Sequence, residues 1–123
     1  MIKGIGIDAV QISRMEKWAN YDNLLERFFD PRELVIIRER GKGMIRSLAS
    51  HFAAKEAFSK AVGTGFAGIA LKDIMLLNRK DERPFLHVEG TALEAMKNSG
   101  AGKVHVSLTH DGDMALAFVV LEV

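Results

Sequence analysis

Cysteine is absent from this 123-residue sequence, and proline occurs only twice. The lack of cysteine excludes disulfide bridges and thiolate zinc sites, and it suits a reducing, cytoplasmic compartment. Tryptophan and tyrosine each occur once, and the formal net charge is only +1. A nucleic-acid-binding domain needs a basic face interleaved with aromatic side chains, so the composition argues against that class. No apolar run approaches the roughly 18 residues that a membrane span requires.

The short length limits what the chain can build. Domains typically have roughly 100–150 residues, so residues 1–123 are expected to form a single domain. A chain of this size buries one core but has little depth for an enclosed active site. Any enzymatic site is therefore expected in a surface groove or between subunits.

Helix signals dominate the first half of the chain. Capping-box patterns begin at Ser13, Asp30 and Thr91, and each marks a helix start. The longest helix is expected over residues 44–62, because its apolar residues recur at spacings of three and four and glycine follows directly. This helix is apolar on nearly all sides, which is typical of a buried element.

Strand signals open the chain and dominate its second half. Asp111-Gly112 is a strong hairpin turn signal. Strands are expected over residues 1–10, 74–77, 85–88, 104–108 and 114–120. Helices that come early and hairpins that come late predict an α+β fold with a mostly antiparallel sheet.

Glu56 lies on a helical face that is otherwise apolar. A buried, unpaired carboxylate is costly, so Glu56 needs a cation, a metal ion or a proton. Lys60, four residues further on, offers an ordinary ion pair within the helix. A metal or catalytic site is the alternative.

Asp8 ends the first apolar strand, where it either caps the following turn or holds a hard cation. Two carboxylates cannot complete the octahedral shell of Mg²⁺, which usually takes water and substrate phosphate oxygens as well. A Mg²⁺ site made of Asp8 and Glu56 would therefore predict a phosphorylated substrate.

Two further features leave their roles open. His110 lies at the mouth of the last hairpin, where a functional role and simple solvation are both compatible with the pattern, and the four histidines lack a zinc-binding spacing. Gly63-Thr64-Gly65 is only a weak match to a phosphate cradle, and ending the preceding helix is the alternative role.

Three segments together resemble the holo-acyl-carrier-protein synthase family of 4′-phosphopantetheinyl transferases. The sequences are GIGID at residues 4–8, FAAKEAFSKA at residues 52–61 with GTG at 63–65, and HVSLTH at residues 105–110. Their order and spacing extend the resemblance over essentially the whole chain. It implies a small, mostly antiparallel sheet packed on a long central helix, and a trimer with active sites between subunits.

The resemblance also implies a reaction. Members of this family transfer 4′-phosphopantetheine from coenzyme A to a serine of apo-acyl carrier protein, with Mg²⁺, in fatty-acid biosynthesis, and adenosine 3′,5′-bisphosphate leaves. A trimeric module that binds coenzyme A or the carrier without catalysis is the alternative. Such a module is expected to lose a metal carboxylate, whereas both are present here.

Site residues follow from the resemblance, position by position. Asp8 and Glu56 correspond to the Mg²⁺ ligands, and Lys60 is expected near the reacting phosphate, so these three form the expected catalytic set. Arg14 matches a carrier-facing position, to which Lys17 and Arg27 could add, although a solvated helix face is the alternative. The residues expected to contact coenzyme A are Lys42, Lys60, Gly63, Gly65, Arg83, Pro84 and His110.

The sequence also departs from the family at three places near the expected nucleotide site. Ser50-His51 replaces a common Gly-Arg, Glu82-Arg83-Pro84 replaces Gly-Lys-Pro, and Gly43 replaces a residue that is often basic. Arginine makes strong charge-assisted contacts with phosphate, so each change predicts weaker binding of the nucleotide part of coenzyme A. Arg46 and Arg83 are the candidates to compensate.

Overall fold

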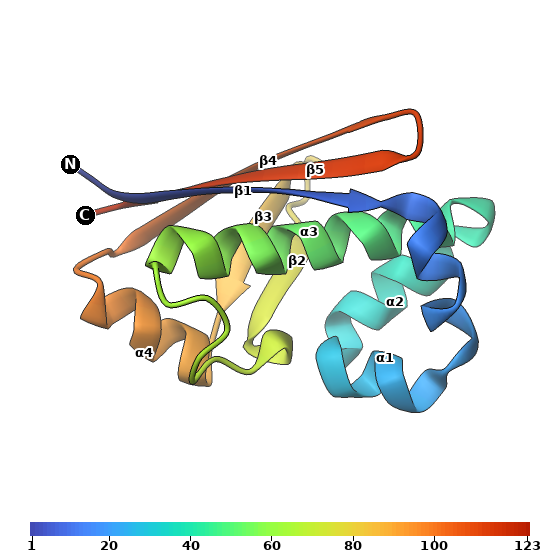
Figure 1. The fold of residues 1–123 in the computed structure, drawn as a ribbon, viewed down its shortest axis with the longest axis horizontal. Coiled ribbons are helices and arrows are strands. Elements are labelled where there is room, and N and C mark those ends of the chain that lie inside the picture. The colour runs from blue at the N-terminus through green and yellow to red at the C-terminus, as the bar shows by residue number, and fades with distance from the viewer.

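A computed structural model describes all residues, 1–123, and shows an α+β fold with two antiparallel sheets (Figure 1). In chain order the elements are β1 (Ile2–Gln11), the 3₁₀ helices η1 (Ile12–Glu16) and η2 (Trp18–Asn20), α1 (Asp22–Phe28), α2 (Pro31–Glu39), η3 (Gly41–Gly43), α3 (Met44–Val62), η4 (Leu71–Asp73), β2 (Ile74–Asn78), β3 (Pro84–Val88), α4 (Gly90–Asn98), β4 (Lys103–Asp111) and β5 (Met114–Glu122). The expected fold class is confirmed. No helix is both long enough and apolar enough to cross a membrane.

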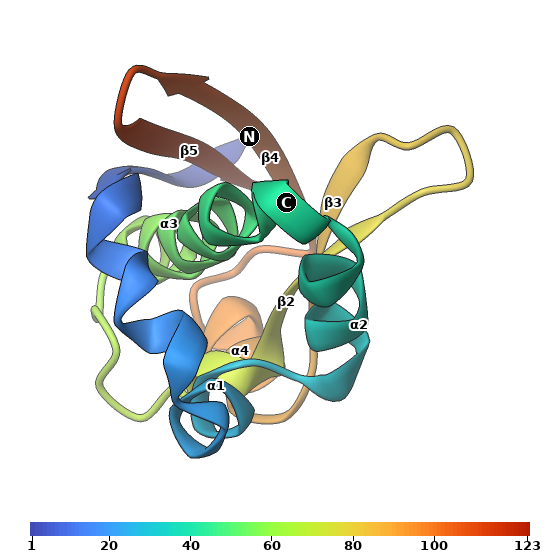
Figure 2. The same cartoon turned by 90° about the vertical axis from the view of Figure 1, so that its right-hand side faces the viewer.

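The larger sheet has the strand order β1-β5-β4, and β2 and β3 form a separate hairpin. One face of the larger sheet packs on α3, which also contacts β2 and α2. Figure 2, turned so that α3 is seen nearly end on, shows the larger sheet on one side of this helix and the elements α1, α2 and β2 on others. A single cluster of buried apolar residues fills the space between these layers.

Two glycines allow β1 to lie directly against α3. A Cβ atom on Gly6 would lie 2.0 Å from the carbonyl oxygen of Ala57, and one on Gly4 would lie 2.0 Å from that of Ala61. Any side chain at these positions would therefore collide with the helix backbone. Because alternate strand residues share a face, Asp8 follows Gly4 and Gly6 on the side that meets α3.

Several local expectations agree with the structure. The helix expected over residues 44–62 coincides with α3, and Gly63 ends it with a φ of 92°. Asp30 forms the expected capping box: its side chain accepts a hydrogen bond from the backbone of α2, and Glu33 Oε1 accepts one from Asp30 N over 3.2 Å. Local sequence chemistry is therefore sufficient to begin α2 and to end α3.

The other two expected capping boxes are wrong, because a distant residue supplies the partner. Ser13 begins no α-helix, and its hydroxyl donates to Asp113 Oδ2 over 2.6 Å. Thr91 N donates to Asp73 Oδ2 over 2.9 Å, so a side chain of η4 satisfies the start of α4. The hairpin loop is also one residue later than expected, since Asp111 pairs with Met114 across Gly112 and Asp113.

Candidate active site

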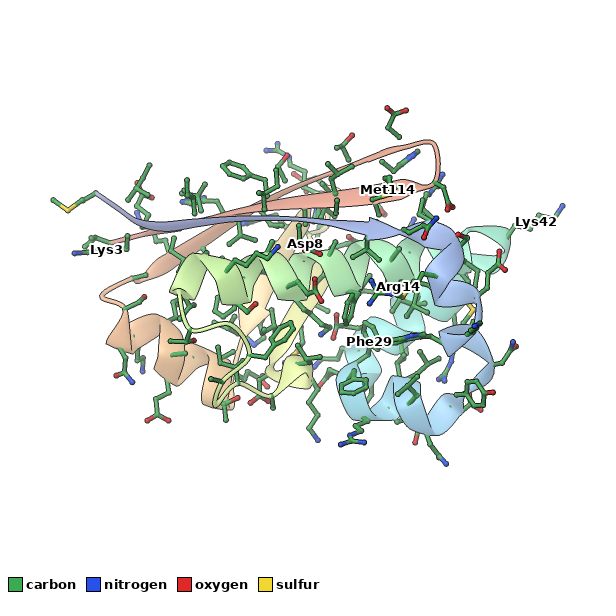
Figure 3. The ribbon with its side chains drawn as sticks, in the orientation of Figure 1. Lys3, Asp8, Arg14, Phe29, Lys42 and Met114 are labelled. Atoms are coloured by element: carbon green, nitrogen blue, oxygen red, sulfur yellow. The ribbon has the colours of Figure 1, made fainter.

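Asp8 reaches α3 from the inner face of β1 (Figure 3). Its Oδ1 atom accepts a hydrogen bond from Lys60 Nζ over 2.9 Å, and Nζ also donates to the carbonyl oxygen of Ile7 over 3.2 Å. The second carboxylate oxygen, Oδ2, is buried and has no hydrogen-bond partner in the protein. A buried oxygen without a partner is costly, so Asp8 is a candidate to bind a cation or a donor from outside the chain.

Glu56 lies one turn before Lys60 on α3 and interacts with Asp8. Burial raises the pKa of Glu56 to about 7, and the nearby carboxylate of Asp8 acts in the same direction. The positive charges of Lys60 and Arg14 oppose this shift. Glu56 is therefore close to half-ionised at neutral pH when nothing else binds.

Two purely structural roles were expected as alternatives: an ion pair of Glu56 with Lys60, and a turn cap made by Asp8. Neither is found. Lys60 pairs with Asp8 rather than with Glu56, because β1 brings the aspartate within 2.9 Å of its ammonium group. The hydrogen bond to Asp8 raises the pKa of Lys60, which therefore stays protonated. Asp8 does not cap the following turn, since Lys60 is the only donor to its side chain.

The pair of Asp8 and Glu56 has the donor chemistry of a hard-cation site. Both side chains offer oxygen, one oxygen is buried and bare, and no third histidine, aspartate or glutamate joins them to complete a metal centre. Mg²⁺ is often held by one or two carboxylates together with water and substrate phosphates. The residues present therefore fit this ion when a phosphorylated substrate supplies the remaining oxygens.

A second cluster of ionisable residues lies in the core, where sequence reasoning missed it. Glu33 and Lys55 are fully buried and His51 nearly so. Lys55 Nζ donates to Glu33 Oε1 over 2.7 Å, to the carbonyl oxygen of Leu71 over 2.9 Å, and to that of Ile74. This ammonium group therefore ties α3 to α2, η4 and β2.

Glu33 completes the cluster by accepting from four donors. Asp30 N and Lys55 Nζ donate to Oε1, and His51 Nδ1 and Leu76 N bond to Oε2, over 2.8 and 3.2 Å respectively. A signal was present in the sequence, because Lys55 and Glu56 together interrupt a stretch of alanine and phenylalanine in the long helix. An ionisable residue at such a position requires a buried partner.

An open cavity of about 440 Å³ lies beside this cluster, between α2, α3, the β2–β3 hairpin and β4. We call it the arginine-lined cavity because it contains two arginines and no carboxylate. Its lining residues are Ile36, Arg40, Gly43, Arg46, Ser47, Ser50, His51, Leu76, Asn78, Pro84 and Leu108. Gly43, Ser50 and His51, three of the positions that depart from the family pattern, thus share one surface with Arg46.

The remaining residues expected to contact coenzyme A are spread over the chain. Pro84 lines the arginine-lined cavity and, with Arg83, a neighbouring one at the hairpin. Lys42, in η3, extends into solvent at one end of the molecule (Figure 3). His110 is exposed on β4, and its side chain makes no hydrogen bond within the chain. One chain by itself therefore does not gather the expected set.

Gly63 and Gly65 lie in the loop after α3. Both have positive φ angles, 92° and 60°, which glycine adopts without strain. The helix-ending role is confirmed for Gly63.

The three residues expected to face a carrier protein lie between β1 and α2. Arg14 is on η1 beside the active-site carboxylates, with its guanidinium 5.9 Å from the centre of the Phe52 ring. Arg27 lies over Phe28 at 5.5 Å, and Lys17 is exposed. Of these three residues, Arg14 lies near Glu56, and its charge lowers the pKa of that carboxyl.

The sequence model of the 4′-phosphopantetheinyl transferase superfamily matches residues 4–119 of this chain. The chain therefore belongs to the 4′-phosphopantetheinyl transferase superfamily, and it is an enzyme of that class. The match includes Asp8, Glu56 and Lys60, which the structure brings together.

Individual relatives are more specific than the superfamily match. The holo-[acyl-carrier-protein] synthase of Treponema denticola is 54% identical over 122 residues, which cover 99% of both chains. The crystal structure of the Neisseria meningitidis holo-[acyl-carrier-protein] synthase superposes with a TM-score of 0.87 at 33% identity, covering 99% of both chains. That of the Helicobacter pylori enzyme in complex with coenzyme A has a TM-score of 0.82 at 32% identity, covering 96% of this chain and 99% of that one. The resemblance stated from the sequence is confirmed.

Proposed function

We propose that this chain transfers the 4′-phosphopantetheine group of coenzyme A to a serine of an apo-acyl carrier protein, in fatty-acid biosynthesis. Residues 1–123 would act as a single catalytic domain. The observation that carries the proposal is the pair of Asp8 and Glu56, with its bare, buried oxygen beside Lys60, in a chain that matches these transferases over residues 4–119.

The transfer exchanges one phosphorus–oxygen bond for another. The serine Oγ of the carrier forms a bond to the β-phosphorus of coenzyme A, and the bond from that phosphorus to the bridging oxygen breaks. Adenosine 3′,5′-bisphosphate leaves with the electron pair of the broken bond. Glu56 accepts the serine proton as the general base. Lys60 stabilises the negative charge that develops on the leaving phosphate.

Asp8 and Glu56 would also hold Mg²⁺, which when bound acts as a Lewis acid on the phosphate oxygens. The bare Oδ2 of Asp8 and the oxygen-only donor set support this assignment. Positioning of the two substrates contributes much of the remaining rate enhancement, as in phosphoryl transfer generally.

Mass spectrometry of a purified apo-acyl carrier protein tests the transfer directly. After incubation with this chain, coenzyme A and Mg²⁺, the carrier is expected to gain one phosphopantetheine group. A chelator in excess over Mg²⁺ is expected to abolish the gain, and renewed Mg²⁺ to restore it. If several carriers gain nothing although coenzyme A binds, the chain is a non-catalytic binding module.

Carrier recognition in this proposal uses the basic surface of Arg14, Lys17 and Arg27. Carrier proteins are acidic, and a basic surface with Arg14 near Glu56 would steer them toward the site by charge complementarity. This attraction weakens at high salt because exposed charges are screened.

Coenzyme A would bind between subunits of a trimer, because the residues expected to contact it are spread over the surface of one chain. These residues are Lys42, Lys60, Gly63, Gly65, Arg83, Pro84 and His110. A second copy could bring two parts of this set together. The outer face of the larger sheet supports such an assembly, since Ile5, Ile7 and Phe118 are 62%, 58% and 43% exposed. Ile7 pairs with Phe118 across β1 and β5, so the exposed residues form one apolar patch of the kind that marks interfaces.

Ile7→Asp is expected to convert the trimer into monomers and to remove transfer activity, because a carboxylate in an apolar interface loses its hydration. Size-exclusion chromatography with light scattering measures the mass, and the carrier assay measures the activity. Val35→Asp is the matched control, since Val35 is equally exposed at 57% but lies on α2. A wild-type chain that is monomeric and fully active would refute the shared site.

A further inference from the structure

His51 presents one ring nitrogen to the core and lines the arginine-lined cavity with the rest of its ring. Its Nδ1 atom lies 2.8 Å from Glu33 Oε2. An ionised carboxylate only accepts hydrogen bonds, so Nδ1 carries the proton of the neutral ring. Nε2 has no partner within the chain and is then a lone-pair acceptor at the cavity wall.

The charges around His51 come from two elements, α2 and α3. Glu33 on α2 faces Nδ1, Lys55 follows one turn later on α3, and Arg40 ends α2. Arg46, five residues earlier on α3, lines the same cavity. Burial lowers the pKa of His51, Lys55 and Arg40 act in the same direction, and Glu33 opposes them. The free protein therefore holds a neutral imidazole here at neutral pH.

The lining of the cavity is suited to binding a phosphate group, except at the neutral ring of His51. Arg40 and Arg46 supply guanidinium groups, and Ser47, Ser50 and Asn78 supply neutral hydrogen-bonding groups. Charge-assisted bonds from arginine are among the strongest that a phosphate receives. The neutral His51 instead directs a lone pair toward the anion, which a phosphate oxygen cannot satisfy.

We propose that His51 takes up a proton when the 3′-phosphate monoester of coenzyme A enters this cavity, so that recognition of the monoester depends on pH. The proposal rests on the proposed use of coenzyme A as substrate. It makes His51 a specificity-determining residue for that substrate.

The proton comes from solvent, and it gives the ring a donor at each nitrogen. Nε2–H then donates to the phosphate while Nδ1–H continues to donate to Glu33. The new positive charge lies between two negative ones, which offsets the cost of burying it. The arginine that relatives commonly have at this position carries its charge at every accessible pH, so it would not create this dependence.

Calorimetric titration in buffers of different ionisation enthalpy measures the proton uptake. At pH 8 the wild-type chain is expected to take up about one proton more per coenzyme A than per dephospho-coenzyme A, which lacks the monoester. His51→Arg and His51→Asn are expected to show no such excess. His51→Asn retains a donor to Glu33 but has no group that reaches the cavity. Protonation changes of coenzyme A itself are common to all three proteins and cancel in the comparison.

Binding constants test the same proposal in a second way. Uptake of one proton makes affinity fall by up to about tenfold for each unit of rising pH. The preference for coenzyme A over dephospho-coenzyme A should therefore weaken from pH 7 to 8 in the wild type. His51→Arg should keep its preference at both pH values, and the smaller preference of His51→Asn, which then depends on Arg40 and Arg46, should not change with pH either.

Different experimental results would contradict the proposed transferase function and the proposed role of His51. If coenzyme A binds and is used but the wild type and both variants take up equal numbers of protons, His51 has no such role and the transferase stands. If no protein form binds coenzyme A, the proposed substrate is wrong. Thermal unfolding of each variant identifies any that fails to fold. Ser50→Ala removes a neutral group of the same cavity but keeps His51, so it is expected to retain the excess proton uptake.

Discussion

Glu56→Gln is expected to lower the rate of phosphopantetheine transfer by about 10²–10⁴-fold, the range that a lost general base typically gives. Glutamine has nearly the same shape but neither accepts a proton nor binds Mg²⁺ as a carboxylate does. The carrier assay by mass spectrometry, with rates followed over time, measures the loss. Glu39→Gln is the matched control, because Glu39 is exposed at the end of α2 and is expected to leave the rate unchanged.

The same substitution is expected to stabilise the metal-free protein at alkaline pH. The folded-state pKa of Glu56, about 7, exceeds its ordinary value of 4.5, so the folded chain holds this proton more tightly than the unfolded chain does. Stability is therefore lost as pH rises through about 7, when Glu56 ionises beside Asp8. Removing that charge should give Glu56→Gln a higher Tm than the wild type at pH 8 with a chelator present.

Millimolar Mg²⁺ should then reverse the order of the two Tm values, because a ligand that binds only the folded state raises its stability. The wild type gains from the ion and Glu56→Gln gains little. A lower Tm for Glu56→Gln than for the wild type in chelator at pH 8 would contradict the repulsion between the two carboxylates. Loss of activity together with a gain in stability is typical of a site selected for function.

Gly6→Ala is expected to lower the free energy of unfolding by about 3 kcal/mol or more. The new methyl carbon would lie 2.0 Å from the carbonyl oxygen of Ala57 and 2.7 Å from the nitrogen of Ala61. Both are backbone atoms of α3 and cannot rotate away, so the strand and helix must separate. Urea denaturation followed by circular dichroism measures the effect.

The separation should also move Asp8 away from Glu56, so any folded Gly6→Ala protein is expected to have lost transfer activity. Gly43→Ala is the matched control, since a Cβ there meets nothing closer than 3.7 Å and its φ of −86° suits alanine. Equal midpoints for Gly6→Ala and Gly43→Ala would show that β1 and α3 do not pack as described.

Much of the fold could be predicted locally. The periodicity of residues 44–62 predicted α3, Gly63 its end, and the Asp30 capping box the start of α2. Each of these signals involves residues within about one helical turn of one another, so the chain near them is sufficient to determine the outcome. The hairpin loop was misplaced by one residue, because its register is set by pairing along the whole of β4 and β5.

The sequence predicted which residues belong to the candidate site but not which of them contact one another. The sequence identified Asp8, Glu56 and Lys60, while their pairing remained open. Lys60 could bond Glu56 along the helix or Asp8 from 52 residues away, and it bonds Asp8. That choice depends on how closely β1 approaches α3, which Gly4 and Gly6 permit.

By itself the sequence determined the long helix α3, the start of α2, the strands and the types of the residues able to do chemistry, because these depend on local spacing and side-chain type. Only the tertiary structure decided which partners they take. The bond from Ser13 to Asp113 spans 100 residues, and Glu33 meets His51 and Lys55 from another helix. A polar side chain forms a hydrogen bond with whichever group folding brings within about 3 Å. That distance depends on tertiary packing and not on the local order of residues in the sequence.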